Sequence, residues 1–379
     1  GLLKGAYMSE QNRGFDWPSF RPPLESYRLD YGIGIVGYAG IVRAQQLPAY
    51  RLAGYRVIAA ADINPARREL ATLDGIPHVY ADYRELLRRD DVDIIDCAVD
   101  HSTVADMAAR VQILKDAAQA GKAVLMQKPM ATDLATAQQM VEIAEDHGVP
   151  FAVNQNLRFD PAIYLTRQFL TPERFGRPGY IHFANISIEG PRFGFGPEGV
   201  VLAWQIHAID SIRWLAGGEA TSVFCTNQNH ASMYQLAFSS GAVCNYFEYH
   251  NQDNFRNETP VRVWAEKGAV RANHRWNPSS RWERDLVEVR AYEWPKQVGW
   301  VTYNLPDELT NRHVFIQPCY DMCASIGGFI GIMGEFMQSL HEKRPAVTNA
   351  RDNLESLRIY FAGQLSAEQR RPIDPRSVS

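Results

Sequence analysis

The pattern of hydrophobic and polar positions changes its period near residue 154. Before it, short apolar runs alternate with segments whose apolar residues recur every three or four positions. This alternation of buried strands with amphipathic helices is typical of a parallel sheet covered by helices on both faces. The expected strands are Gly32 to Val36, Val57 to Ala61, His78 to Tyr80, Ile94 to Val99, Ala123 to Met126 and Phe151 to Val153. We therefore predict a doubly wound α/β domain in the first part of the chain.

Beyond residue 154, apolar and polar residues alternate one by one, which predicts an antiparallel sheet with one buried face. The expected strands are Gly179 to Glu189, Thr221 to Thr226, Met233 to Phe238, Ala242 to Tyr249, Val261 to Glu266 and Val287 to Tyr292. Helical patterns cover Val200 to Leu215, Tyr320 to Leu340 and Arg351 to Ser366. The second part is thus predicted to be an α/β domain with an open, mostly antiparallel sheet.

A chain of 379 residues is too long for one ordinary core, so two domains are expected. We expect a nucleotide-binding domain at 31–153 and a substrate and oligomerisation domain at 154–379. Residues 1–30 are predicted to form an arm rich in proline and aromatic residues. The arm is either a disordered lead-in or is pinned by Trp17, Phe20 and Tyr27 to the body or to a second subunit.

Composition and charge exclude several classes of protein. The formal net charge of −4 argues against a nucleic-acid partner, and no apolar run is long enough to cross a membrane. No secretory signal is visible, and the five cysteines are odd in number and scattered, which favours reduced thiols and a cytoplasmic location. Cys319 and Cys323 have no further ligand types nearby, so we predict no metal site.

The first expected strand ends in a glycine-bearing turn. A Gly-x-Gly-x-x-Gly pattern fits Gly32, Gly34 and Gly37, but the first two fall inside the strand. The useful frame begins after the strand and consists of Gly37, Tyr38, Ala39, Gly40, Ile41 and Val42. A strand, a tight turn and a helix N-terminus together present backbone N–H groups to a pyrophosphate, so this turn is a candidate cofactor-binding site.

Other candidate cofactor contacts lie where later strands end. Asp62 ends the second strand 25 residues after Gly37, where a carboxylate accepts hydrogen bonds from ribose hydroxyls and repels a 2′-phosphate. Arg67 and Arg68 follow it, so NADP is disfavoured without being excluded. The fourth and fifth strands deliver further candidates to the same crevice: Ala98, Val99, Asp100, His101, Gln127 and Lys128.

Several short motifs, in this order and spacing, resemble the Gfo/Idh/MocA family of sugar and polyol oxidoreductases. The turn GYAGIV is similar to the family's Gly-x-Gly-Gly-Ile-Gly, and Gln127-Lys128-Pro129 falls where the family has Glu-Lys-Pro. Asn156-x-Arg158-Phe159-x-Pro161 resembles the family's junction motif, and His207 with Asp210 resembles the helix that carries Asp-x-x-x-His. The resemblance extends from Tyr31 to about Pro372 and implies a Rossmann domain followed by a domain with an open sheet.

The resemblance implies an NAD(P)-dependent dehydrogenase acting on a sugar, polyol or derivative, with Lys128 and His207 as catalytic residues. A histidine is suited to take a hydroxyl proton near neutral pH, and a lysine favours the alkoxide and orients its oxygen. The chain departs from the family at Gln127 and at Ala203, each of which replaces a carboxylate. The alternatives are therefore a nicotinamide-binding sensor without turnover, or an NAD-dependent glycosidase of the same family.

Substrate contacts are expected at the junction between the two domains. The candidates there are Asn156, Arg158 and Tyr164, and Gln205 is a candidate substitute for the missing carboxylate. Four tryptophans lie between Arg275 and Tyr303, namely Trp276, Trp282, Trp294 and Trp300. Interface and core aromatics are commoner than sugar-stacking ones, so we expect contacts of a homodimer or homotetramer through the C-terminal sheet.

Overall fold

The computed structural model describes residues 7–8, 30–187, 197–228, 231–250, 258–275, 286–293, 296–304 and 326–378. The chain divides into two compact units, which are described separately. The parallel-sheet unit comprises Pro23–Asn156 and Gly328–Leu354, and the nine-stranded unit comprises Gly1–Pro22, Leu157–Gly327 and Glu355–Ser379. The expected boundary at residue 154 differs from this division, because residues 328–354 group with the parallel sheet.

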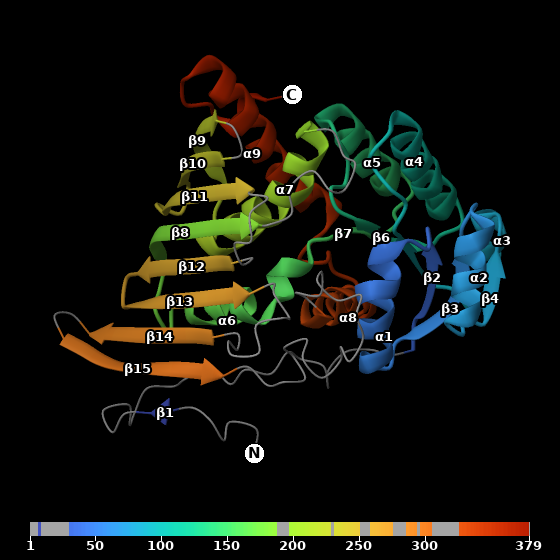
Figure 1. Ribbon diagram of the computed structural model, residues 1–379, viewed down its shortest axis with the longest axis horizontal. Coiled ribbons are helices and arrows are strands. Elements are labelled where there is room, and N and C mark those ends of the chain that lie inside the picture. Colours follow the sequence, from blue (N-terminus) through green and yellow to red (C-terminus); the bar gives the residue numbers. More distant parts are fainter. Residues whose placement is uncertain are drawn as a thin grey trace. The chain divides into compact units, whose positions relative to one another are not determined.

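The parallel-sheet unit is built on six strands in the order β4-β3-β2-β5-β6-β7, and every neighbouring pair is parallel (Figure 1). Their bounds are β2 Gly32–Val36, β3 Arg56–Ala61, β4 His78–Tyr80, β5 Ile94–Cys97, β6 Ala123–Gln127 and β7 Phe151–Asn154. This is the doubly wound order in which a ligand crevice opens at the carboxyl ends of the strands. The six predicted strands are confirmed.

Helices connect these strands, and all of those named here except α1 begin after a residue whose side chain caps the first turn. They are α1 Leu47–Ala53, α2 Pro65–Leu73, α3 Tyr83–Leu87, α4 Val104–Gln119 and α5 Leu134–Asp146. The N-cap of α4 is Thr103, which exchanges hydrogen bonds with Asp106 in a capping box. Pro48 is tolerated because the π-helical turn η3 Val42–Gln46 precedes α1, which places the proline in the first turn of α1.

Residues 328–354 contribute most of α8, Ile326–Glu342, and the start of α9, Ala350–Gln369, to the parallel-sheet unit. The hydroxyl of Tyr55 donates to the carbonyl of Ile330 over 2.8 Å, and the N–H of Val153 donates to the carbonyl of Thr348 over 2.9 Å. These long-range bonds explain why a late segment of the chain belongs to the early unit.

The nine-stranded unit has strands in the order β1-β15-β14-β13-β12-β8-β11-β10-β9, drawn as a ladder in Figure 1. Their bounds are β1 Tyr7–Met8, β8 Pro178–Ser187, β9 Ala220–Gln228, β10 Ala231–Phe238, β11 Val243–His250, β12 Glu258–Ala265, β13 Gly268–Arg275, β14 Leu286–Glu293 and β15 Lys296–Asn304. All pairs are antiparallel except β8 with β11, so the predicted mostly antiparallel sheet is confirmed.

Helices α6 Pro161–Phe169 and α7 Pro197–Ala216 pack against one face of this sheet. The strands present alternate residues to that face, as in β10, where Tyr234, Leu236 and Phe238 are buried. The sequence patterns missed α6, β13 and β15. They also missed β1, which pairs with β15 and attaches part of the arm to this sheet.

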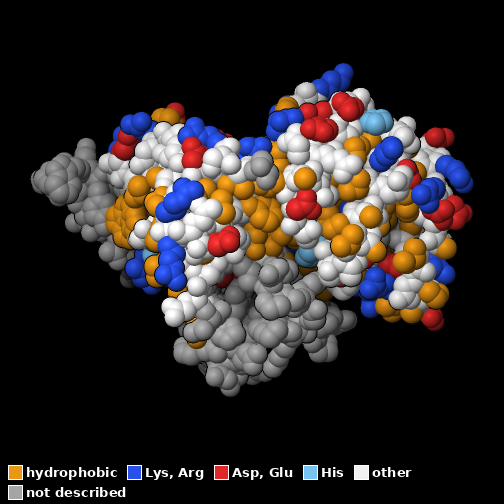
Figure 2. Space-filling view, turned by 90° about the horizontal axis from the view of Figure 1, so that it is seen from above, with side chains coloured by type: hydrophobic (Ala, Val, Ile, Leu, Met, Phe, Trp, Pro, Cys, Tyr) orange, Lys and Arg blue, Asp and Glu red, His pale blue; other side chains and the backbone are white. Residues whose placement is uncertain are grey.

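The described surface carries charges of both signs. On the face shown in Figure 2, Lys and Arg side chains are interspersed with Asp and Glu side chains, and the described part of this face has no large basic patch. No helix among the described residues is long and apolar enough to cross a membrane. Cys319, Cys323, Trp276, Trp282 and Trp294 lie outside the described residues, and Trp300 falls in β15.

Candidate active site at the strand ends

The turn that follows β2, residues 37–42, has the backbone conformation expected of a pyrophosphate-binding turn. Gly32 and Gly34 lie inside β2, whereas Gly37 follows it with a φ of +89°. A Cβ on Gly37 would lie 2.8 Å from the backbone N of Val99 and 2.9 Å from the carbonyl carbon of Ala98. Glycine is therefore needed at residue 37 both for the left-handed conformation and for the close approach of β5.

The rest of the turn leads into the helix. A Cβ on Gly40 would have no atom within 4 Å, so the chain faces open space there. Ile41 is half-buried and Val42 is fully buried against the sheet. The side chain of Tyr38 is buried as well, and its hydroxyl donates to Asp74 over 3.0 Å. The turn is thus held by its side chains, while its backbone at residues 39 and 40 is exposed or half-exposed.

Asp62, at the end of β3, is fixed beside this turn. Its carboxylate accepts from the backbone N–H of Tyr38 over 2.7 Å and from the backbone N–H of Asn64 over 2.8 Å. Arg67 lies 3.6 Å from the same carboxylate, and the guanidinium of Arg68 donates to the carbonyls of Asp62 and Ile63. The structure therefore joins two predicted cofactor residues, Tyr38 and Asp62, directly.

A buried carboxylate on β5 anchors the helix that follows the turn. Asp96 is fully buried and accepts hydrogen bonds from Gln46 on η3 and from the hydroxyl of Tyr50 on α1. Burial raises the pKa of Asp96 to about 7, against the opposing effect of these donors. The carboxylate inside the strand is therefore explained as the partner of the helix after the turn.

The corner after β5 holds four of the predicted cofactor residues. Ala98 donates its N–H to the carbonyl of Val36; Ala98 is buried and Val99 is half-buried. The exposed Asp100 accepts from the backbone N–H of His101 over 2.6 Å. Burial, with the positive charges of Arg110 and Lys128, lowers the pKa of His101 to about 4, so its imidazole is neutral at physiological pH.

Lys128 follows β6 at the same edge of the sheet. Burial and the positive charge of Arg110 lower the pKa of Lys128 to about 8. Its neighbour Gln127 is buried, and no described residue forms a hydrogen bond with Gln127 Nε2. The same holds for the side-chain amides of Asn154, the last residue of β7, and of Gln155, which follows it; β7 pairs with β6. Buried amides without partners in the described chain are suited to a polar ligand.

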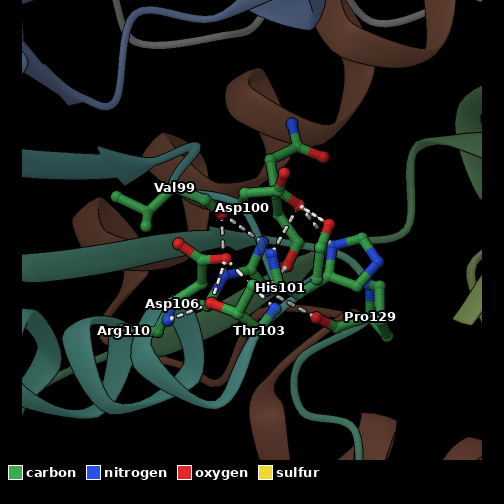
Figure 3. Close-up of polar contacts among 9 residues, drawn as sticks. Val99, Asp100, His101, Thr103, Asp106, Arg110 and Pro129 are labelled. Atoms are coloured by element: carbon green, nitrogen blue, oxygen red, sulfur yellow. Dashed lines mark hydrogen bonds and ion pairs between the residues drawn. The ribbon is translucent and has the colours of Figure 1, made fainter. Parts of the chain in front are cut away.

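Arg110, on α4, was missed by the sequence patterns. The residue is 1% exposed, and its guanidinium donates to backbone carbonyls, among them those of Val99 and Pro129 (Figure 3). The signal was present, because Arg110 stands three residues after Met107 and four before Leu114, on the buried face of α4. An arginine among these apolar residues indicates a charge that has hydrogen-bond partners inside the protein.

The remaining candidates lie on η4, Asn156–Phe159, and in the nine-stranded unit. His207 and Ala203 are buried on α7. Gln205 is also buried, and its Oε1 accepts from the hydroxyl of Tyr234 on β10 over 2.7 Å. Because this bond turns the amide of Gln205 toward the sheet, a substrate contact by Gln205 stays a prediction.

Arg158 is held by a buried ion pair. Its guanidinium donates to both oxygens of Asp210, over 2.6 and 2.7 Å, and Ser356 donates to the same carboxylate over 2.9 Å. Asp210 lies three residues after His207 on α7, so this pair fixes the helix that carries His207. Asn156 is buried at the start of η4.

Tyr164, on α6, packs against aromatic neighbours. Its ring centroid lies 6.1 Å from that of Phe159 and 6.4 Å from that of Trp214, and burial raises the pKa of its phenol. The structure thus gathers the predicted cofactor residues and Lys128 at one sheet edge. It places His207, Gln205, Arg158 and Tyr164 in the other unit, so the pairing of Lys128 with His207 stays a prediction.

The chain is similar to known oxidoreductases along most of its length. Residues 31–155 match the model of the Gfo/Idh/MocA oxidoreductase family, NAD-binding Rossmann fold. D-apiose dehydrogenase from Paraburkholderia graminis is 25% identical over 357 residues, which are 89% of this chain and 88% of that protein. Inositol 2-dehydrogenase from Rubrobacter xylanophilus is 26% identical over 258 residues, 65% of this chain and 72% of the relative.

A solved structure supports the same fold. An oxidoreductase from Agrobacterium radiobacter, in complex with NAD+, L-tartaric acid and magnesium, has a TM-score of 0.75 at 19% identity, over 92% of this chain and 99% of that one. The family match falls on the unit in which Gly37, Asp62 and Lys128 meet at one edge of a parallel sheet. Residues 31–155 thus match the NAD-binding Rossmann fold of the Gfo/Idh/MocA oxidoreductase family, and the chain is similar to D-apiose dehydrogenase along most of its length.

Proposed function

We propose that this protein transfers a hydride between NAD and a secondary alcohol of a sugar, polyol or related compound. The proposal rests on three features at the carboxyl ends of strands in the parallel sheet. They are the glycine turn at Gly37 after β2, the carboxylate of Asp62 after β3 and the partly buried Lys128 after β6. In a doubly wound sheet, this edge is where a dinucleotide lies.

The residues at this edge fit NAD. The turn offers exposed backbone next to the start of a helix, and the open space at Gly40 admits a pyrophosphate. The carboxylate of Asp62 has lone pairs left for ribose hydroxyls, since each oxygen accepts one backbone N–H. Gln127, with an amide nitrogen that no described residue bonds, fits the nicotinamide ribose.

When bound, NAD supplies a hydride acceptor at its nicotinamide ring. The chain supplies the proton chemistry and the orientation. The Lys128 ammonium donates a hydrogen bond to the substrate oxygen and stabilises its negative charge as the proton leaves. His207 takes that proton as the general base, and the buried pair of Arg158 with Asp210 keeps α7 in place.

NAD is favoured over NADP by the surroundings of Asp62. A 2′-phosphate next to this carboxylate would be repelled, and Arg68 donates to backbone carbonyls instead of facing outward for a phosphate. The variant Asp62→Ser should weaken NAD and strengthen NADP, so that the ratio of the two Kd values changes by at least about tenfold. An unchanged ratio, measured by calorimetry, would remove the support for NAD.

The substrate class rests on the names of the relatives, which act on D-apiose and on an inositol. Gln127 and Ala203 replace two carboxylates of the family pattern, which makes the site less anionic and extends the candidates to sugar acids. A panel of sugars, inositols and sugar acids should therefore be assayed for NADH formation. Absence of turnover with the whole panel, at saturating NAD, argues against dehydrogenase chemistry.

The catalytic assignment is tested by single variants in the same assay. Lys128→Met and His207→Ala should each lower kcat by well over about tenfold while NAD still binds. Lys115→Met is the matched control, because Lys115 is an exposed lysine on α4. A wild-type rate in either site variant excludes the role proposed for that residue.

A second candidate function is cofactor binding without dehydrogenase turnover. The observation that favours it is Ala203, a buried methyl on α7 where the family pattern has a carboxylate. A sensor would bind NAD and form neither product nor NADH. A glycosidase that uses bound NAD would release a sugar with no net NADH. The panel assay separates these outcomes when both NADH and free sugar are measured.

We further propose that the face of the nine-stranded sheet opposite α6 and α7 joins subunits into a homodimer or homotetramer. Three large apolar side chains on this face are half exposed, namely Met233 at 52%, Val243 at 47% and Trp264 at 46%. Val243 and Trp264 both stand opposite Tyr180 on neighbouring strands, which makes a continuous apolar row.

The oligomer is tested by light scattering. Trp264→Glu should shift the mass toward the monomer, because it places a charge in the apolar row. Leu73→Glu, a change on α2 at a side chain that is 74% exposed, is the control and should leave the mass unchanged. A wild-type protein that is a stable monomer would overturn this proposal.

A further inference from the structure

The fully buried guanidinium of Arg110 reaches the ends of two neighbouring strands. It donates to the carbonyl of Val99 from Nε over 2.8 Å and from Nη2 over 2.5 Å. Through Nη1 it donates to the carbonyl of Gln127 over 3.0 Å and to the carbonyl of Pro129 over 2.7 Å. Figure 3 shows this side chain reaching from α4 to Val99 and Pro129.

The two carbonyls bound by Nη1 belong to the residues immediately before and after Lys128. The backbone that carries Lys128 is thus held on both sides by one rigid, planar group. The third carbonyl belongs to Val99, whose backbone N lies where a Cβ of Gly37 would collide. Arg110 therefore links the backbone on both sides of Lys128 to Val99, the residue that packs against Gly37.

We propose that Arg110 is a positioning residue for Lys128: it fixes the backbone around the lysine and keeps a second positive charge beside it. This inference rests on the catalytic role proposed for Lys128. It explains why a cation is buried among carbonyls on an otherwise apolar helix face, where an aliphatic side chain would pack without the cost of desolvation.

The electrostatic consequence is visible in the neighbouring groups. Burial is the larger cause and the charge of Arg110 the second cause of the lowered pKa of Lys128. The other titratable groups around Arg110 are Cys97 on β5, Asp100 and His101 at the corner, and Asp106 on α4. His101 is neutral near pH 7, and Asp106 is engaged by Thr103.

The proton affinity of Lys128 can be measured without any substrate. Acetic anhydride acylates only the neutral amine, so the rate of acetylation of the Lys128 peptide against pH, followed by mass spectrometry, reports the pKa. In the wild-type protein the midpoint should lie near 8. In Arg110→Gln it should rise by about one unit, because the neighbouring positive charge is removed. Lys115→Gln removes the same charge from an exposed position of α4 and should leave the midpoint unchanged.

A second variant separates position from charge. Arg110→Lys keeps the charge, so the midpoint should stay near the wild-type value, but its compact ammonium lacks the planar fork of donors that reaches the carbonyls of both strand ends. Hydrogen exchange of the amides in residues 125–131 should become at least about tenfold faster, since the strand end is no longer fixed. If Arg110→Gln does not fold, the hydrogen exchange measured in Arg110→Lys still tests the proposal.

The outcomes decide the proposal. An unchanged midpoint in a folded Arg110→Gln, or unchanged hydrogen exchange in Arg110→Lys, overturns it. Slower exchange or a lowered midpoint would contradict it as well. Failure of the proposed function is recognised separately, because Lys128→Met would then keep the wild-type turnover whatever the labelling shows.

Discussion

Replacing Gly37 by alanine should destabilise the parallel-sheet unit, whereas the same change at Gly40 should not. The added methyl at residue 37 would lie 2.8 Å from the backbone N of Val99, so two hydrogen-bonded strands would have to separate by roughly half an ångström. The φ of +89° adds a conformational penalty that alanine does not escape. At Gly40 there is open space and no positive φ.

The magnitude follows from these two effects. A non-glycine residue in the left-handed region costs about 1 to 2 kcal/mol, and overpacking against fixed backbone costs about 1 to 3 kcal/mol. Gly37→Ala should therefore lose about 2 to 5 kcal/mol, a large part of the stability of a domain. In a unit of this size the midpoint of thermal unfolding should fall by roughly 5 to 15 °C.

Gly40→Ala separates cofactor binding from folding. Its unfolding midpoint should equal that of the wild type or rise slightly, since alanine is favoured over glycine at the start of a helix. Its Kd for NAD should increase by about tenfold or more, because the methyl would occupy the space assigned to the pyrophosphate.

Circular dichroism gives the midpoints and calorimetry gives the Kd values. A wild-type midpoint in Gly37→Ala would refute the close approach of the turn to β5. Wild-type affinity for NAD in Gly40→Ala would refute the placement of the pyrophosphate at this turn.

Three further predictions follow from buried and shifted groups. Asp210→Asn, which leaves Arg158 in a buried site, should lower the free energy of unfolding by about 3 to 5 kcal/mol, while Glu145→Gln, which breaks an exposed pair, should change it by less than about 1 kcal/mol in denaturant titrations. Because the pKa of Asp96 is raised to about 7, its contribution to stability is lost as pH rises from about 4 through 7. Asp96→Asn should flatten the measured stability in that range, and an unchanged slope would contradict the shift. Since the ammonium form of Lys128 is the proposed active form, kcat/KM should fall as pH rises through about 8, and a fall only above pH 10 would be inconsistent with that assignment.

The strands of the parallel sheet could be predicted because each is a short apolar run bounded by turns. The correct frame of the glycine turn was also predictable, since Gly32 and Gly34 had to belong to the first strand. In contrast, β13 and β15 carry polar and charged residues among few apolar ones, and α6 follows directly on a polar junction. Local patterns do not reveal such elements, because neighbouring strands and helices stabilise them.

Only those residues of the candidate site that directly follow a predicted strand could be predicted from the sequence. The positions of Asp62 and Lys128 follow from where strands end. The partner of Arg158 could not be predicted, because Asp210 is 52 residues away on another element. The same holds for Gln205, whose bond to Tyr234 depends on how α7 lies on β10. The place of Arg110 among the apolar residues of α4 indicated burial, but its acceptors could not be predicted, because backbone carbonyls leave no signature in the sequence.

The ratio of NADH formed to substrate consumed tests the central proposal most directly. It should be measured with wild-type protein, NAD and the sugar, polyol or sugar acid that the panel identifies. Hydride transfer to NAD predicts one NADH for each molecule of substrate oxidised, and loss of both signals in Lys128→Met. Consumption of substrate without NADH, or NAD binding with no consumption at all, would contradict it.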